Sequence, residues 1–348
     1  MLDVAVIGAG QAGLAMGYWL SQLKNQKEFL LIDKASSVGD VWRQRYDSLV
    51  LFTPRSYSSL PGLALEGADH GFPSKDEVAE YLEKYANHFS LPLQLETEVT
   101  RIEEVNDAYQ IYTNKGTIQA KQVVVATGPF HTPFVPAISQ SLSPAIAQFH
   151  SSEYKNPAQL QPGNVLIVGG GNSGAQIAVE LSETREVHLS VGQKMRYFPL
   201  TMLGKSLFWW FDKIGILHAD SQSPLGKRIQ QSGDPIFGFH LKNLAANQKV
   251  DLHLRTVSGS GEKVQFEDHH ELKVQNIIWA TGFQPVYGWI DIKGLINTDG
   301  RPIHHRGITN KKGFYFLGLP WLHKRGSSLL LGVGEDAEYL SRVIDREF

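Results

Sequence analysis

Residues 165–181 read VLIVGGGNSGAQIAVEL, and residues 4–20 read VAVIGAGQAGLAMGYWL. Each stretch is a short apolar run, then a glycine-rich turn, then apolar residues at helical spacing. This order is typical of a strand, a phosphate-binding turn and a helix in a βαβ unit. The sequence therefore predicts an α/β fold in which one chain carries two Rossmann-like dinucleotide-binding domains.

The composition excludes several classes of function. Of the 348 residues, 42% are hydrophobic and 20% charged, and the net charge is -2, so we expect no nucleic acid partner. No cysteine is present, which excludes disulfides, thiolate metal sites and a cysteine nucleophile. No apolar run approaches the ~18 residues of a membrane span, and the N-terminus has no signal-peptide pattern. We therefore expect no transmembrane segment and a cytoplasmic location.

The first glycine motif carries the signature of a flavin or NAD site. Gly8, Gly10 and Gly13 form GxGxxG directly after a predicted strand. In this pattern the first glycine allows a tight turn, the second lets the backbone approach a pyrophosphate, and the third lets the helix pack on the strand. Asp33 ends the next predicted strand, where a carboxylate accepts hydrogen bonds from a ribose 2′-hydroxyl. Since Asp33 would repel a 2′-phosphate, this site fits FAD or NAD and does not fit NADP.

The second glycine motif differs in the charge that follows it. Gly169, Gly171 and Gly174 repeat the spacing, but no acid follows the next strand. The chain there has Gln193, Lys194 and Arg196, and neutral or basic groups accept a 2′-phosphate. This site is the better candidate for NADPH. Two such sites in one chain predict a relay, in which NAD(P)H at the second site reduces a flavin at the first.

The other segments complete the expected organisation. Ser74 opens a capping box and predicts a helix, and short runs within 93–125 predict a β-meander. LFWWF at 207–211 is expected to pack as a buried helix, although an exposed interaction patch remains the alternative, and the last helix is expected from about Glu335. We place an FAD-binding domain at residues 1–156 plus 280–348, with an NAD(P)H-binding domain inserted at 157–279.

Several further segments carry a resemblance to a known superfamily. VVVATGPFHTPFVP (123–136) and IIWATGF (277–283) each end a strand in ATG, and with the glycine motifs they resemble the two-dinucleotide-binding-domain flavoproteins. The disulfide-reductase branch needs a cysteine pair, which this chain lacks. HSSEYKNP (150–157) resembles the fingerprint of the flavin-containing monooxygenases, and GDVW (39–42) resembles their flavin-contacting segment. PLTMLGKSLF (199–208) is similar to the plant YUCCA branch, and residues 319–337 are similar to small bacterial members.

The resemblance and the two motifs together give the expected site residues. Those expected at FAD are Gly8, Gly10, Gln11, Ala12, Gly13, Asp33, Lys34, Val41, Trp42, Thr53, Val99, Ala126, Thr127, Gly128, Gly318 and Leu319. Those expected at NADPH or NADH are Gly169, Gly171, Asn172, Ser173, Gly174, Gln193, Lys194, Arg196, Thr281 and Gly282. Phe52 and Thr53 are the candidate catalytic residues beside the flavin.

Two positions depart from the family pattern. Phe52 stands where larger relatives have an asparagine near the flavin, and a phenyl ring donates no hydrogen bond. Pocket packing and a catalytic role both remain open for Phe52. Gly192 stands where many relatives have an arginine for the NADP 2′-phosphate, so we expect NADH and NADPH both to serve.

The resemblance implies an FAD-dependent NAD(P)H monooxygenase. In that family, reduced flavin and O2 form a C4a-(hydro)peroxide that oxygenates a small molecule, at a sulfide or amine heteroatom or at a ketone by Baeyer–Villiger insertion. Two alternatives stay open: an NAD(P)H:flavin oxidoreductase or oxidase without oxygenation, and a redox-sensing accessory to a cation transporter. The expected partners are the substrate and O2, with a homodimer left open, and no metal is expected, because the adjacent histidine pairs 269–270 and 304–305 lack ligand spacing.

Overall fold

The N-terminal apolar run forms the centre of the first sheet in the computed structural model, which describes residues 1–346. β1 (Leu2–Ile7) pairs in parallel with β2 (Phe29–Ile32) and with β6 (Gly116–Val125). The strand order is β3-β2-β1-β6-β5-β4, and β21 (Phe314–Phe316) also pairs with β6. The short strand β3 (Leu93–Gln94) extends the parallel part, while β4 (Val99–Val105) and β5 (Ala108–Thr113) form an antiparallel meander with β6, as predicted.

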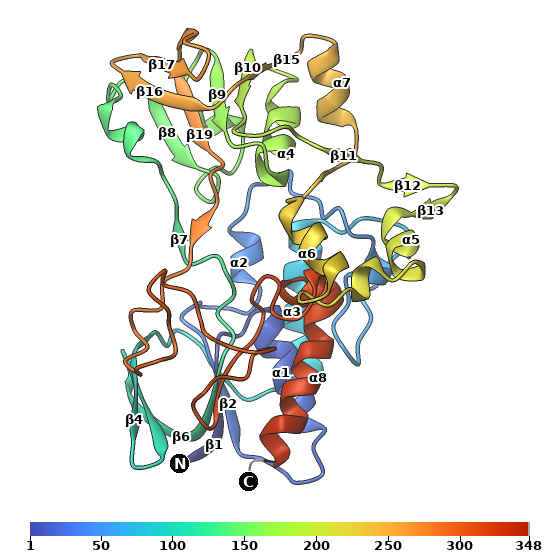
Figure 1. Cartoon of the computed structure of the whole chain (residues 1–348), viewed down its shortest axis with the longest axis vertical. Coiled ribbons are helices and arrows are strands. Elements are labelled where there is room, and N and C mark those ends of the chain that lie inside the picture. The colour runs from blue at the N-terminus through green and yellow to red at the C-terminus, as the bar shows by residue number, and fades with distance from the viewer. Residues whose placement is uncertain (347–348) are drawn as a thin grey trace.

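Three helices cover one face of the first sheet. They are α1 (Gln11–Ser21), α3 (Lys75–His88) and α8 (Leu330–Arg346), and their apolar faces share one core cluster with Val4 and Val6 of β1. The alternate β1 residues, Ala5 and Ile7, face a second cluster formed largely by β5, β6 and the segment 287–322. In Figure 1 this first unit occupies the lower half of the view, with α1 and α8 side by side.

The second sheet grows in the same way around β9 (Val165–Val168). Its order is β15-β10-β9-β19-β8 and all its pairs are parallel. The other strands are β8 (Ala147–His150), β10 (Val187–Ser190), β15 (Val250–His253) and β19 (Asn276–Trp279). Helices α4 (Asn172–Leu181) and α7 (His240–Ala246) pack on one face. The antiparallel strands β16 (Thr256–Ser260), β17 (Lys263–Phe266) and β18 (Glu271–Lys273) lie at the other face. The predicted fold, with two dinucleotide-binding units, is confirmed.

Short elements connect and flank the two units. These are α2 (Asp40–Arg43), β7 (Thr132–Pro133), β11 (Tyr197–Phe198), β12 (Thr201–Met202), β13 (Lys205–Ser206), α5 (Leu207–Lys213), α6 (Pro224–Gln231), β14 (Ile236–Phe237) and β20 (Phe283–Gln284). Single turns of 3₁₀ helix lie at Arg55–Tyr57, Ala137–Ser141, Pro157–Gln159, Ile216–His218 and Arg325–Ser328. β7 and β20 pair where the chain passes between the units, as Figure 1 shows for β7. Over residues 1–346, no helix combines the length and apolarity that a bilayer span needs.

Three details differ from the expectations. β8 precedes residue 157 yet is an edge strand of the second sheet. The boundary proposed at 156/157 therefore assigns β8 to the FAD-binding domain, although its pairing places it in the second unit. α8 begins at Leu330 and not near Glu335, because Gly332 and Gly334 lie inside the helix, where their missing side chains let it pack on Gly326 and Pro61. The LFWWF segment forms α5 but is buried only at its first two residues, and its other three residues are half-buried.

Candidate functional site

The first glycine turn leaves open space at its middle glycine only. Gly8 has φ +108°, and a Cβ there would lie 2.7 Å from the carbonyl oxygen of Ala126. A Cβ on Gly13 would lie 1.8 Å from the carbonyl oxygen of Gly8. Gly10, the N-cap of α1, has φ −75°, and no atom lies within 4 Å of the place its Cβ would take. Two of these glycines therefore serve packing, and the third leaves the approach to the helix N-terminus free.

Asp33 is fixed beside this turn by backbone amides. Its Oδ2 accepts a hydrogen bond from the Ala9 N–H at 2.6 Å, and its Oδ1 accepts one from the Ala35 N–H at 2.8 Å. A carboxylate has further lone pairs, so Asp33 can still accept a hydrogen bond from a ribose hydroxyl. Of the neighbouring predicted residues, Lys34 is exposed and Val99, at the start of β4, is half-buried.

The C-terminal segment closes onto the same turn. A Cβ on Gly318, which has φ +76°, would lie 2.7 Å from the Cβ of Ala12, and Leu319 beside it is buried. The Gln11 side chain donates to the Ser328 carbonyl oxygen at 2.8 Å. Because β21 and β1 both pair with β6, residues more than three hundred positions apart in the sequence meet here.

The ATG segment after β6 reaches this turn as well. Ala126 lies against Gly8, and Gly128 has φ +70°. The Thr127 Oγ1 lies 3.0 Å from the His131 Nε2, which fixes the threonine hydroxyl. The structure therefore brings the predicted residues 126–128 to the first glycine turn.

Trp42 adds a buried polar group that has no partner in the described part of the chain. The Trp42 Nε1–H is buried and has no hydrogen-bond partner among residues 1–346. Thr53 is buried and Val41 is exposed. A buried unpaired donor needs an explanation, and a bound polar ligand supplies one. The open cradle at Gly10, the Asp33 carboxylate and the free Trp42 donor together fit a dinucleotide such as FAD.

The second glycine turn repeats the geometry of the first. Gly169 has φ +121°, and a Cβ there would lie 2.3 Å from the Ala280 carbonyl oxygen. A Cβ on Gly174 would lie 2.1 Å from the Gly169 carbonyl oxygen, whereas Gly171 again has no atom within 4 Å. The predicted residues Thr281 and Gly282 follow Ala280, so they lie next to this turn.

The polar residues of the second helix start hold neighbouring segments. The Asn172 side chain donates to the Pro235 carbonyl oxygen at 3.1 Å and accepts from the Phe237 N–H at 3.3 Å, which anchors β14. Ser173 lies within hydrogen-bond reach of the Tyr46 hydroxyl.

The end of β10 presents three exposed residues, Gly192, Gln193 and Lys194. Arg196 does not join them, because its guanidinium donates to the carbonyl oxygens of Ser232 and Gly233 behind α6. One residue that the sequence did not suggest lies here: the Arg255 guanidinium donates to the Gly192 carbonyl oxygen at 3.4 Å. Only the pairing of β15 with β10 brings Arg255 to this place, and no local pattern signals that pairing.

Direct contacts join the first unit to the helix that follows the second glycine turn. The buried Tyr46 hydroxyl donates to the Gln176 Oε1 of α4 at 2.8 Å, and burial raises the pKa of Tyr46 to about 12, so it stays a donor. The Gln176 side chain donates in turn to the Val50 carbonyl oxygen at 2.9 Å. The segment after α2, in the first unit, is therefore held against α4, the helix that follows the second glycine turn.

The fingerprint histidine and tyrosine have structural partners. His150, at the end of β8, is buried with its Nε2 at 2.9 Å from the Gly282 carbonyl oxygen, and burial lowers its pKa. The Tyr154 hydroxyl donates to the Glu180 carboxylate of α4 at 2.7 Å. Thr281 donates to the Phe134 carbonyl oxygen. These contacts fix the path of the second ATG segment between the units.

Aromatic rings from segments of both units contact one another. The Phe52 ring stacks on Phe237 at a centroid distance of 4.5 Å, and on Phe208 at 6.2 Å. The Arg45 guanidinium lies 5.5 Å from the ring centroids of Phe130 and of Phe283, the residues that follow the two ATG segments closely. Burial lowers the pKa of Arg45, and no carboxylate pairs with it within residues 1–346. Sequence reasoning missed Arg45 and its two rings because only the fold brings them together.

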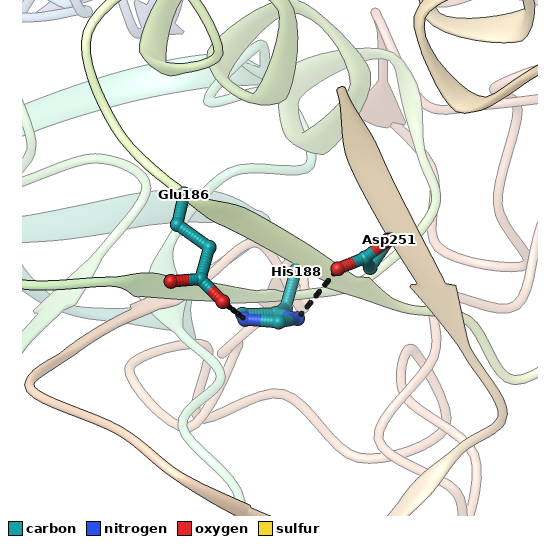
Figure 2. Close-up of side chains that lie close together, drawn as sticks. All are labelled: Glu186, His188 and Asp251. Carbon is teal, nitrogen blue, oxygen red and sulfur yellow. Dashed lines mark hydrogen bonds and ion pairs between the residues drawn. The ribbon is translucent and has the colours of Figure 1, made fainter. Parts of the chain in front are cut away.

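One cluster outside these turns has the residue types of a metal site. The His188 Nε2 lies 3.2 Å from Glu186, and its Nδ1 lies 3.6 Å from Asp251. Figure 2 shows the two carboxylates at opposite sides of the imidazole ring. One ligand atom of each residue lies within 4.8 Å of the other two, but both carboxylates are exposed, as acidic surface groups without an ion commonly are. The His188 ring is hydrogen-bonded from both sides, with Glu186 at its Nε2 and the His253 Nε2 at 3.0 Å from its Nδ1.

Comparison with known proteins identifies relatives along the whole chain. The family model described as pyridine nucleotide-disulphide oxidoreductase matches residues 5–197. A Geobacillus kaustophilus protein named uncharacterized oxidoreductase CzcO-like is 55% identical over 98% of this chain and 97% of its own length. The Arabidopsis thaliana protein named probable indole-3-pyruvate monooxygenase YUCCA1 is 28% identical over 95% of this chain and 87% of its own length.

Solved structures share the same architecture. A flavin-containing monooxygenase from Stenotrophomonas maltophilia is 26% identical, with a TM-score of 0.82 over 99% of this chain and 98% of that protein. The bacillithiol disulfide reductase Bdr from Staphylococcus aureus has a TM-score of 0.72 at 16% identity, which shows a shared fold alone.

Proposed function

The chain belongs to the pyridine nucleotide-disulphide oxidoreductase family, and from that membership we propose that it inserts one oxygen atom of O2 into a small organic molecule. It is an FAD-dependent oxidoreductase that uses NAD(P)H, related to the flavin monooxygenases. The proposed reaction is substrate + O2 + NAD(P)H + H⁺ → oxygenated substrate + H2O + NAD(P)⁺. The disulfide chemistry in the family name needs thiols, and this chain has no cysteine.

One observation carries the proposal. Two glycine turns of the same geometry each follow a strand in a parallel part of its sheet, and the hydrogen bond between Tyr46 and Gln176 joins the segment after α2 in the first unit to α4, the helix that follows the second turn. A single nucleotide site would need only one of them. Two sites joined in this way suit an electron relay, and the similarity to the Stenotrophomonas monooxygenase over nearly the whole chain supports oxygenation as its purpose.

The residues of the first unit would hold FAD. The open approach at Gly10 admits a diphosphate to the α1 N-terminus, Asp33 accepts from a ribose hydroxyl, and the Trp42 N–H donates to a polar atom of the ligand. When bound, flavin accepts a hydride from the nicotinamide and reacts with O2. The protein contributes position, hydrogen bonds and exclusion of water.

The residues of the second unit would hold the nicotinamide nucleotide. Gly171 leaves the same approach open to the α4 N-terminus. Asn172 binds β14 through its side chain and keeps the turn in place without filling it. Gly282, fixed by His150, carries the chain past this site toward the first unit.

The aromatic surface between the units favours an apolar substrate. The rings of Phe52 and Phe237 are half-buried and stacked, and the buried Phe208 ring packs against both. The Arg325 guanidinium lies 5.6 Å from the Phe237 ring centroid. Rings of this kind bind apolar molecules and select against strongly hydrated ones. We propose a small sulfide, amine or ketone as the substrate class, with Phe52 as part of the pocket wall and not as a donor to the flavin.

A coupling measurement tests the proposal. The FAD-loaded enzyme is incubated with NADPH, O2 and methyl phenyl sulfide, and sulfoxide and H2O2 are measured against NADPH consumed. The proposal predicts sulfoxide in a substantial and substrate-dependent ratio to NADPH, with less H2O2 than without the sulfide.

The second candidate is an NAD(P)H oxidase that releases H2O2. Phe52 favours it, because this side chain donates no hydrogen bond at the position where larger relatives have an asparagine. In the same assay this candidate predicts H2O2 equal to the NADPH consumed, whether sulfides, amines or ketones are added. That result would replace the monooxygenase proposal.

A further inference from the structure

The guanidinium of Arg255 lies next to Gly192, close to where a side chain at residue 192 would begin. A Cβ on Gly192 would lie 2.9 Å from one terminal nitrogen of Arg255 and 3.2 Å from its central carbon. The backbone of Gly192 is not in the left-handed region, so the Arg255 side chain is the obstacle to a larger residue there. Arg255 therefore occupies the space that a side chain at residue 192 would take.

Gly192 lies where a dinucleotide-binding unit contacts the adenosine ribose. In a dinucleotide-binding βαβ unit, the residues after the second strand read the adenosine ribose, and an arginine nearby accommodates a 2′-phosphate. β10 is that second strand here, and β15 pairs with it in parallel, with His188 opposite Asp251. The carboxyl ends of both strands therefore lie at one edge of the sheet. Arg255, two residues after the end of β15, lies at this edge, where the ribose is expected.

The charge of Arg255 is available for a ligand. Within residues 1–346 its side chain makes one hydrogen bond, the long one to the Gly192 carbonyl oxygen, and no ion pair. Arg196 is different, because the Ser232 and Gly233 carbonyl oxygens take its donors. Arginine binds phosphate through two parallel N–H donors, which lysine cannot do.

We propose that Arg255 binds the 2′-phosphate of NADPH and makes this site prefer NADPH over NADH. The guanidinium missing at residue 192 is supplied from the end of the neighbouring strand, and Lys194 adds a second positive charge without the paired N–H donors of arginine. This differs from the expectation that NADH and NADPH both serve. The inference rests on the proposed assignment of the second unit to the nicotinamide nucleotide.

Calorimetric titration of the FAD-loaded protein tests the inference without turnover. The probes are ADP-ribose and its 2′-phosphate derivative, which lack the nicotinamide ring. For Arg255→Ala we expect binding of the 2′-phosphate probe to weaken about 10- to 100-fold, the range of a charge-assisted hydrogen-bond pair, and binding of ADP-ribose to stay the same. Arg255→Lys should fall between the two, and Arg346→Ala, an exposed arginine on α8, should change neither.

A relocated guanidinium gives the sharper control. In the Arg255→Ala background the space beside Gly192 is free, so Gly192→Arg should restore tight binding of the 2′-phosphate probe. The inference is overturned if Arg255→Ala leaves the preference for the 2′-phosphate probe intact, or weakens both probes equally. Neither result concerns oxygenation, whereas H2O2 equal to the NADPH consumed with sulfides, amines and ketones alike overturns the monooxygenase proposal and leaves the phosphate preference standing.

Discussion

At the scale of single residues, alanine substitutions at Gly10 and Gly171 should affect nucleotide binding without affecting folding. Both have φ and ψ that alanine adopts freely, and neither has an atom within 4 Å of its missing Cβ. Gly10→Ala should therefore fold normally but lose FAD, with affinity reduced about tenfold or more, since the methyl group enters the pyrophosphate approach. Gly171→Ala should keep FAD and lose reduction by NADPH. Flavin absorbance per protein and anaerobic bleaching by NADPH measure the two effects.

The matched control is Gly13→Ala. Its added methyl group would lie 1.8 Å from a backbone oxygen, so the helix must shift and we expect a loss of about 1–3 kcal/mol or more of unfolding free energy. If Gly10→Ala unfolds like Gly13→Ala, or binds FAD as the wild type does, the assignment of the open glycine to the pyrophosphate is wrong.

Residue identity predicted the glycine turns but not the residues that arrive from other strands. The roles of Gly8 and Gly13 followed from the spacing, and the structure confirms both close approaches. Arg255 and Arg45 could not be found in this way, because their positions depend on which strands pair and on how the two units face each other.

At the scale of elements, the capping box of α3 should make a measurable contribution to the free energy of unfolding. The Ser74 hydroxyl accepts from the Glu77 N–H, and the Glu77 carboxylate accepts from the Ser74 N–H at 2.8 Å. Ser74→Ala should lower the free energy of unfolding by about 1 kcal/mol. Urea denaturation measures this, with the exposed Ser48→Ala as control, and an equal effect of both variants would contradict the role of the cap.

The elements also show where sequence patterns fail. The cap of α3 was predicted because its signal is local, and it is confirmed. The start of α8 was misplaced because two glycines, which ordinarily weaken a helix, lie within it for close packing on Gly326 and Pro61. A local rule cannot include a contact made by a distant segment.

For the whole molecule, wholly or partly buried histidines predict acid sensitivity. Burial lowers the pKa values of His131, His150, His253 and His304 below the ordinary 6.5. As the pH falls below 6.5, these histidines bind protons in the unfolded chain but stay neutral in the folded chain. The free energy of unfolding should therefore decrease, by up to about 1.4 kcal/mol per pH unit for each such proton.

Urea midpoints at neutral and mildly acidic pH measure this slope. His150→Gln removes one of these protons and should flatten the slope, since glutamine does not titrate. A slope that is unchanged in this variant would show that His150 is not among the groups responsible.

The central claim concerns the fate of the oxygen atom. The FAD-loaded enzyme is supplied with NADPH, methyl phenyl sulfide and oxygen-18 gas, and the sulfoxide is analysed by mass spectrometry in the presence of catalase. The account predicts that the sulfoxide carries the heavy isotope and still forms when catalase removes free H2O2. Sulfoxide that disappears with catalase, or that carries oxygen from water, would contradict it.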